Sequence, residues 1–252
     1  VSSTVPDFAY PHPGCVLAGR LALTSTPAIC LQQGCAGFLY GLAIADQMMR
    51  GGMYRQVLIV GAELLSTIFD YTDAGRDMAV LFADGAGAAV LRAEPGPRGV
   101  LSSHLHTDGT TYEGLSGEIW GTSTYPPVSK RKFDEDRMRP RMNGRQVFVQ
   151  AVRHFKEVVE ECLAANGVGI GDVNRFIFHQ ANMRIIEAVG EGLRIPPDRL
   201  YNNVERYGNT AAASVPIALH EAREAGLVKD GDLVLLAAFG TGFSWGATLI
   251  RW

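Results

Sequence analysis

Apolar residues recur every three or four positions along several stretches of the chain, which is the spacing of helices that pack one face against a core. Along residues 36–50 the stripe ends at Gly51-Gly52, and along residues 146–165 it ends at Asn166-Gly167. Gly and Asn are typical residues at helix ends. The same reasoning predicts further helices over residues 183–193 and 212–225.

Short, continuously apolar runs predict strands that are buried on both faces of a sheet. Residues 78–83 and 87–91 form two such runs joined by Asp84-Gly85-Ala86, which predicts a strand pair with a tight turn. The other predicted strands lie at residues 57–60, 100–106, 176–178, 233–239 and 244–250.

The two halves of the chain repeat one pattern. Residues 79–91 and 233–250 both run as apolar strand, small-residue turn and apolar strand. The mixture of helices and buried strands predicts an α/β fold, and the repeat predicts a duplicated architecture. We expect a first half over residues 1–95 and a second half over residues 96–252.

Residues 107–142 interrupt the second half. They lack periodicity and are rich in Gly, Pro, Ser, Thr and charge, with aromatic residues at Tyr112, Trp120 and Tyr125. A loop of this length is unusual in a compact domain and is often functional. We therefore interpret about 107–142 as a long insertion.

Composition and charge exclude several classes of function. The net charge is −3, and the basic run at residues 130–132 is followed by acidic residues 134–136, so no nucleic-acid partner is expected. No apolar segment reaches the roughly 20 residues that cross a bilayer, and no signal peptide is recognisable, so we expect a cytoplasmic protein without a membrane span. The four cysteines are irregularly spaced and form no CxxC pair, which predicts neither a disulfide framework nor a metal site.

Cys35 is the first candidate for chemistry. It lies among small residues at the start of the helix predicted from residue 36. The partial positive charge of a helix amino terminus favours a thiolate, and the backbone N–H of Cys35 could bind the oxyanion formed when the thiolate attacks. The alternative is a small buried cysteine without chemistry, which this segment alone slightly favours.

His179 and Asn209 are two further candidates. His179 follows a predicted strand, and Asn209 precedes a predicted helix. In open α/β sheets, reactive groups gather at such junctions beyond the carboxyl ends of strands. Each also has an ordinary structural interpretation, because histidine often hydrogen-bonds at a strand end and asparagine often caps a helix.

The joint order of several motifs carries more weight than any single residue. The sequence resembles the ketoacyl synthase III family, the initiating condensing enzymes of fatty-acid synthesis. The resemblance runs over almost the whole chain and rests on GCAGF around Cys35, ADQ in the following helix, FADGAGAAVL at 82–91, HQANMRII at 179–186, GNTAAASVP at 208–216 and AFGTGFSWGA at 238–247.

The resemblance implies a fold and a reaction. The family has the thiolase fold, in which two pseudo-equivalent α/β halves carry central mixed sheets in an α/β/α/β/α layering. Cys35 then corresponds to the acyl-accepting nucleophile, while His179 and Asn209 bind the malonyl thioester carbonyl and stabilise the enolate left by decarboxylation. The backbone N–H groups of Cys35 and Thr241 form a second oxyanion site, where the side chain of Thr241 is expected to matter little.

The resemblance also implies substrate contacts. Arg184 matches the family's phosphate-contacting arginine, and Arg76 matches an arginine beside the adenine of coenzyme A. Both could instead be ordinary surface arginines, and for Arg76 the two interpretations have about equal weight. Tyr10 corresponds to an aromatic that reaches across a dimer interface to the partner's acyl pocket. Phe82 lines the same cavity or serves only in packing.

The substrates implied are an acyl-CoA and a malonyl-acyl carrier protein, handled by a homodimer without a resident cofactor. The family's first βαβ segment has no counterpart before Val1, which is compatible with the chain being a fragment. The long insertion indicates an unusual acyl substrate.

Two alternatives to this reaction stay open. The same fold could serve an acyltransferase or a secondary-metabolite ketosynthase that joins two acyl chains, or a non-catalytic homologue. Thiolase chemistry is disfavoured because the turn at residues 240–242 carries no second cysteine.

Overall fold

The computed structural model describes residues 1–118, 126, 128–135 and 138–252. The first half contains α2 (Gly37–Arg50), β1 (Gln56–Glu63) and β2 (Gly85–Arg92). β1 and β2 are antiparallel, with Gln56 opposite Arg92 and Glu63 opposite Gly85. α2 packs on β1, where a Cβ on Gly41 would lie only 3.2 Å from a methyl carbon of Ile59.

The strand predicted over residues 78–83 is wrong. Residues Arg76–Ala79 form the short helix α3, and β2 pairs with β1 instead. The run is apolar because residues such as Met78 are buried. The segment after α3 hydrogen-bonds to the second half of the chain and not to a neighbouring strand of its own half. The N–H of Asn209 donates to the carbonyl of Leu81, and the N–H of Ala83 donates to the carbonyl of Asn209, at 2.8 and 2.9 Å.

A five-stranded mixed sheet forms the second half, in the order β3-β9-β8-β6-β7. β6, β7 and β8 are parallel, whereas β9 is antiparallel to both β8 and β3. All residues of β8 are buried, which explains its continuously apolar sequence. The strands are β3 (Gly99–Thr107), β6 (Arg175–Phe178), β7 (Leu200–Tyr201), β8 (Leu233–Gly240) and β9 (Ser244–Arg251).

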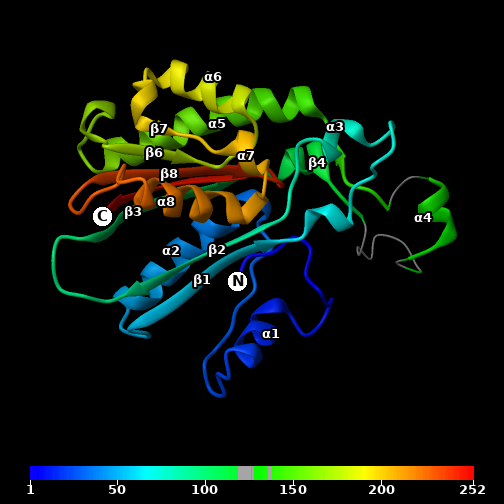
Figure 1. Ribbon diagram of the computed structural model, residues 1–252, viewed down its shortest axis with the longest axis horizontal. Coiled ribbons are helices and arrows are strands. Elements are labelled where there is room, and N and C mark those ends of the chain that lie inside the picture. The colour runs from blue at the N-terminus through cyan, green and yellow to red at the C-terminus, as the bar shows by residue number, and fades with distance from the viewer. Residues whose placement is uncertain (119–125, 127, 136–137) are drawn as a thin grey trace.

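Helices cover both faces of this sheet. α5 (Gly144–Ala165) and α6 (Met183–Leu193) pack on one face, and α2 and α8 (Ser214–Glu224) pack on the other. Figure 1 shows β1 and β2 beyond α2 and α8, and α1 (Pro13–Arg20) beyond β1. The expected α/β/α/β/α layering is therefore present. The repeat in the structure consists of α2-β1-β2 and α8-β8-β9, with an antiparallel strand pair in each half.

Several short elements complete the fold. α1 was not predicted, because residues 1–13 show no periodicity and contain three prolines, the last of which is the first residue of the helix. Within the predicted insertion, the structure describes η3 (Gly109–Gly114), β4 (Leu115–Ser116), α4 (Lys130–Asp134) and β5 (Arg141–Met142). The remaining short elements are η1 (Gly34–Ala36), η2 (Leu65–Thr67), η4 (Ile170–Asp172), η5 (Pro197–Arg199), α7 (Val204–Tyr207) and η6 (Ala211–Ala213).

Within the part of the chain that the structure describes, no helix has the length and apolar character required to cross a bilayer. The structure places Tyr112 in η3, while Trp120 and Tyr125 lie outside the described residues. The division at residue 95, the insertion and its effect on the acyl substrate stay predictions.

Candidate active site

Cys35 lies in η1, directly before α2, and only 5% of its surface is exposed. It belongs to a small cluster with Leu65 and Ala211, against which Phe82 packs. The end of β8 approaches its backbone closely, since a Cβ on Gly240 would lie 2.8 Å from the Cys35 nitrogen. Glycine at this position therefore lets β8 and the turn that carries the thiol come together.

His179 directly follows β6 and is held by both its backbone and its ring. Its N–H donates to the carbonyl of Ala237 on β8 at 2.7 Å, and its Nδ1 lies 2.6 Å from Oγ of Ser214. The same hydroxyl accepts the N–H of Gln180 at 3.4 Å. We therefore assign the hydroxyl proton of Ser214 to Nδ1, which leaves Nε2 of His179 as the donor.

Asn209 precedes η6 and is 5% exposed. Its Oδ1 accepts the N–H of Ala211 at 2.9 Å, so the side chain does stabilise the local turn, as the capping interpretation expects. Among the described residues, its Nδ2 makes no hydrogen bond to the protein, and neither does Nε2 of His179. In each of these two residues, one side-chain atom is held by a hydrogen bond, and one donor has no partner among the described residues and can bind a substrate oxygen.

The turn η6 connects all three candidates. It packs against η1 through Cys35 and Ala211, it follows Asn209, and it leads into Ser214, which holds the imidazole of His179. Segments from residues 35, 179 and 209 that are far apart in the sequence therefore meet around one turn between the two halves.

Burial sets the protonation of the thiol and the imidazole. Burial, with a smaller contribution from the charge of Glu63, raises the pKa of the Cys35 thiol to about 12. Burial lowers the pKa of His179 to about 3. Near neutral pH these shifts favour the uncharged form of both groups. Loss of solvation therefore opposes the resting thiolate that the helix start was expected to favour.

Two other predicted residues lie beside Cys35. Thr241 is in the turn between β8 and β9, where a Cβ on Gly34 would lie 3.4 Å from the Thr241 nitrogen and would collide with the Thr241 hydroxyl. In the described residues, neither the Cys35 N–H nor the Thr241 N–H is paired with a backbone carbonyl. Phe82 stacks on Phe69, with ring centroids 4.9 Å apart.

The remaining predicted residues are exposed. Arg76 begins α3, Arg184 lies in the first turn of α6, and Tyr10 is 88% exposed before α1. Neither arginine forms an ion pair within the described residues. The structure does not bring these three side chains to the Cys35 cluster.

Sequence reasoning missed Ser214 and Glu63. Ser214 stands inside the motif that contains Asn209, yet nothing in its spacing indicated a bond to His179. Glu63 ends an apolar strand, and an acidic residue at that point was the available signal. Both act through contacts between segments distant in sequence.

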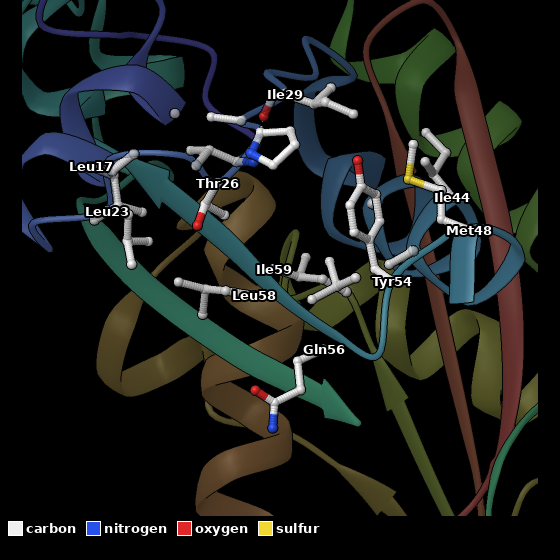
Figure 2. Close-up of a pocket in the computed structure, with 18 of the residues that line it drawn as sticks. Leu17, Leu23, Thr26, Ile29, Ile44, Met48, Tyr54, Gln56, Leu58 and Ile59 are labelled. Atoms are coloured by element: carbon white, nitrogen blue, oxygen red, sulfur yellow. Dashed lines mark hydrogen bonds between the residues drawn. The ribbon is translucent and has the colours of Figure 1, made fainter. Parts of the chain in front are cut away.

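A separate apolar cavity of about 190 Å³ lies between α1, α2 and β1 (Figure 2). Leu17, Ile44 and Leu58 point into it, and none of Cys35, His179 and Asn209 lines it. Among the described residues, no group of three His, Cys, Asp or Glu side chains could hold a metal ion.

Comparison with known proteins matches both halves. Residues 31–109 match the family model described as 3-oxoacyl-[acyl-carrier-protein (ACP)] synthase III, and residues 163–252 match the model of its C-terminal part. The beta-ketoacyl-[acyl-carrier-protein] synthase III of Rhodospirillum centenum is 44% identical over 256 residues, which cover 100% of this chain and 76% of that protein.

Solved structures agree in fold. The 3-oxoacyl-[acyl-carrier-protein] synthase III of Aquifex aeolicus is 38% identical with a TM-score of 0.90, covering 100% of this chain and 75% of that one. The priming beta-ketosynthase of the R1128 polyketide pathway is 32% identical with a TM-score of 0.86, covering 99% of this chain and 73% of that one. Fold and site thus define a condensing enzyme of the thiolase-like fold. The chain belongs to the 3-oxoacyl-[acyl-carrier-protein] synthase III family.

Proposed function

We propose that this chain carries a decarboxylative condensation between an acyl-CoA and a malonyl-acyl carrier protein. The observation that supports it most directly is the meeting around η6 of a buried thiol and two hydrogen-bond donors that have no partner among the described residues. Sγ of Cys35 attacks the thioester carbonyl, the bond to coenzyme A breaks, and the thiol proton leaves with the coenzyme A thiol. No resident cofactor takes part in this proposal.

The second step uses His179 and Asn209. The malonyl carboxylate leaves as carbon dioxide, and the electron pair moves into an enolate whose oxygen accepts hydrogen bonds from Nε2 of His179 and Nδ2 of Asn209. The enolate carbon then attacks the acyl-Cys35 carbonyl, and the freed sulfur takes up a proton. Because the donors are neutral and already oriented, they stabilise charge that develops only during the reaction.

The N–H groups of Cys35 and Thr241 form the proposed oxyanion site for the acyl carbonyl. Arg184 and Arg76 are proposed to contact the phosphate and adenine of coenzyme A, and Phe82 to line the acyl pocket. Exposure of both arginines and the packing of Phe82 against Cys35 support these assignments.

Product analysis tests the function. The chain, incubated with acyl-CoA and malonyl-acyl carrier protein, should release carbon dioxide and yield a β-ketoacyl carrier protein detectable by mass spectrometry. A product formed without loss of carbon dioxide would instead support acyl transfer to another acceptor, and no reaction with any thioester would support a non-catalytic homologue.

A homodimer is also proposed, in which Tyr10 reaches the partner's acyl pocket. Its 88% exposure in the single chain supports this arrangement. Light scattering of the purified protein that gave the mass of one chain at all concentrations would contradict it. A cytoplasmic location stays a prediction, which cell fractionation would test.

Ser214→Ala should slow condensation about ten-fold without changing acylation of Cys35. The hydroxyl is the fixed partner of His179 Nδ1 at 2.6 Å, and loss of one such hydrogen bond can cost about 1.4 kcal/mol, which is a factor of about ten in rate. Rates of carbon dioxide release and of acyl-enzyme formation, measured separately, check this. Ser214→Thr keeps the hydroxyl and should restore most of the rate; an equal fall in both variants would contradict the role of the hydroxyl.

A further inference from the structure

Most of the apolar side chains around Cys35 come from one irregular stretch of the chain. Leu65 belongs to the cluster that contains Cys35, and Ile68, Phe69 and Phe82 pack against it. The rings of Phe69 and Phe82 stack at an interplanar angle of 26°. We call these four side chains the apolar wall. Residues 65–82, all of which the structure describes, form only η2, a turn and the short helix α3, so no long helix or strand holds the apolar wall in place.

The carboxylate of Asp70 holds the middle of this stretch. Asp70 directly follows Phe69 of the apolar wall, and its two oxygens accept the N–H and the hydroxyl of Thr72 at 3.0 and 2.7 Å. The same carboxylate forms an ion pair with Arg139, whose guanidinium donates a hydrogen bond to it. Asp70 therefore fixes the local turn and attaches it to a residue far away in the sequence.

This ion pair is more buried than its neighbour in the same part of the chain. The side chains of Asp70 and Arg139 are 9% and 40% exposed. The pair between Arg131 and Glu135, by contrast, has side chains that are 79% and 40% exposed. Water and salt screen exposed ion pairs strongly and buried pairs less. The pair of Asp70 and Arg139 is therefore the one of the two that can hold a segment in position.

The backbone that follows Arg139 is attached to the second half of the chain. Arg139 precedes β5, which pairs with β4, and the N–H of Asn143 donates to the carbonyl of Gly114 at 2.8 Å. A Cβ on Gly114 would lie 2.7 Å from the ring of Phe243, in the turn that also contains Thr241. The ion pair thus connects the apolar wall to a segment that packs against the turn of the proposed oxyanion site.

We propose that Asp70 and Arg139 are positioning residues that hold the apolar wall against Cys35 and so limit the length of the acyl group that its sulfur accepts. Because Asp70 is bonded to Phe69, displacement of its carboxylate displaces the stacked rings. Loss of the ion pair lets the apolar wall move away from the sulfur and makes room for further methylene groups. The inference rests on the proposed function, because it takes Cys35 as the acyl-accepting nucleophile.

Rates of Cys35 acylation by acetyl-CoA and by octanoyl-CoA, measured by intact-protein mass spectrometry, test the proposal. In Arg139→Ala the ratio of the octanoyl rate to the acetyl rate should rise about ten-fold, the lower end of the discrimination that one methylene group gives in a fitted pocket. Asp70→Asn removes the charge at nearly constant shape and should raise the ratio too. Arg139→Lys keeps a cation and should restore most of the original ratio. Arg131→Ala loses the exposed ion pair of the same segment and should leave the ratio unchanged.

An unchanged ratio in Arg139→Ala, with acetyl groups still loaded, would overturn the inference and leave the proposed function intact. Equal slowing with both acyl-CoA substrates would also overturn it, because the ion pair would then support the fold without selecting among acyl groups. The same holds for an equal rise of the ratio in Arg131→Ala. If Arg139→Ala does not fold, the ratio in Asp70→Asn decides. Absence of any acyl adduct on the unmodified protein would instead contradict the proposed function itself, and the inference with it.

Discussion

Replacing His179 by Ala should leave acylation of Cys35 nearly unchanged and slow condensation about 10²–10³-fold, as expected for loss of one donor to a developing oxyanion. Asn209→Ala should have an effect of the same order. Both side chains offer one donor without a partner in the described residues, whereas neither supplies a proton to the thioester in the first step. Single-turnover measurements with acyl-CoA alone, and then with malonyl-acyl carrier protein, separate the two steps.

His220→Ala is the matched control for this prediction. His220 is an exposed histidine on α8, and its replacement should change neither step. Equal losses of acylation and condensation in His179→Ala would mean that the imidazole acts in both steps or supports the fold. Unchanged condensation in His179→Ala would remove it from the mechanism.

The pH dependence follows from the burial of His179. Because its pKa is lowered to about 3, the imidazole stays neutral across the range in which an ordinary histidine titrates. The rate of condensation from the acyl-enzyme should therefore show no inflection from His179 near neutral pH. Its protonation would remove no donor at Nε2 but would place an uncompensated charge in a buried site.

Gly240→Ala should reduce acylation of Cys35 about 100-fold. A Cβ at this position would lie 2.8 Å from the Cys35 nitrogen and 3.0 Å from its Cβ, distances at which the turn η1 has to move. Displacement of a reacting group by about 1 Å can cost this much rate. The burst of coenzyme A released on mixing with acyl-CoA measures the effect.

Gly19→Ala provides the comparison for Gly240→Ala. Gly19 is a helical glycine in α1 with no heavy atom within 4 Å of the added Cβ, so acylation should be unaffected. If Gly240→Ala acylates at the rate of the unmodified protein, close approach of β8 to Cys35 does not matter for the reaction. Circular dichroism distinguishes a local displacement from loss of the fold.

Hydrophobic periodicity predicted best those helices that bury a regular apolar stripe and those strands that are buried on both faces. The helices α2, α5 and α6 and the strands β8 and β9 lie close to their predicted positions, because each buries a whole stripe or both faces. For the segment after Arg76, the apolar run predicts a strand that pairs locally, and this prediction is wrong. Its apolar residues instead pack and hydrogen-bond against the other half, and no local pattern contains that information.

The sequence predicted which residues form the candidate site. It did not predict their burial, their protonation or their hydrogen-bond partners. Motifs in order indicated Cys35, His179 and Asn209, and the fold brings their segments to one turn. The protonation of the thiol could not be read from the helix start, because it depends on burial of the sulfur, which raises the pKa of the thiol and is set by the whole fold. Ser214 and Glu63 matter through contacts across the fold, which spacing along the chain does not express.

The central claim is that the sulfur enclosed by η1 and η6 becomes covalently loaded. Intact-protein mass spectrometry after incubation with acyl-CoA tests this directly, with Cys15→Ala as an exposed-thiol control. One acyl mass should appear on the unmodified protein and on Cys15→Ala, map to the peptide that contains residue 35, and be absent from Cys35→Ala. An adduct of the same mass and yield on Cys35→Ala would contradict the claim.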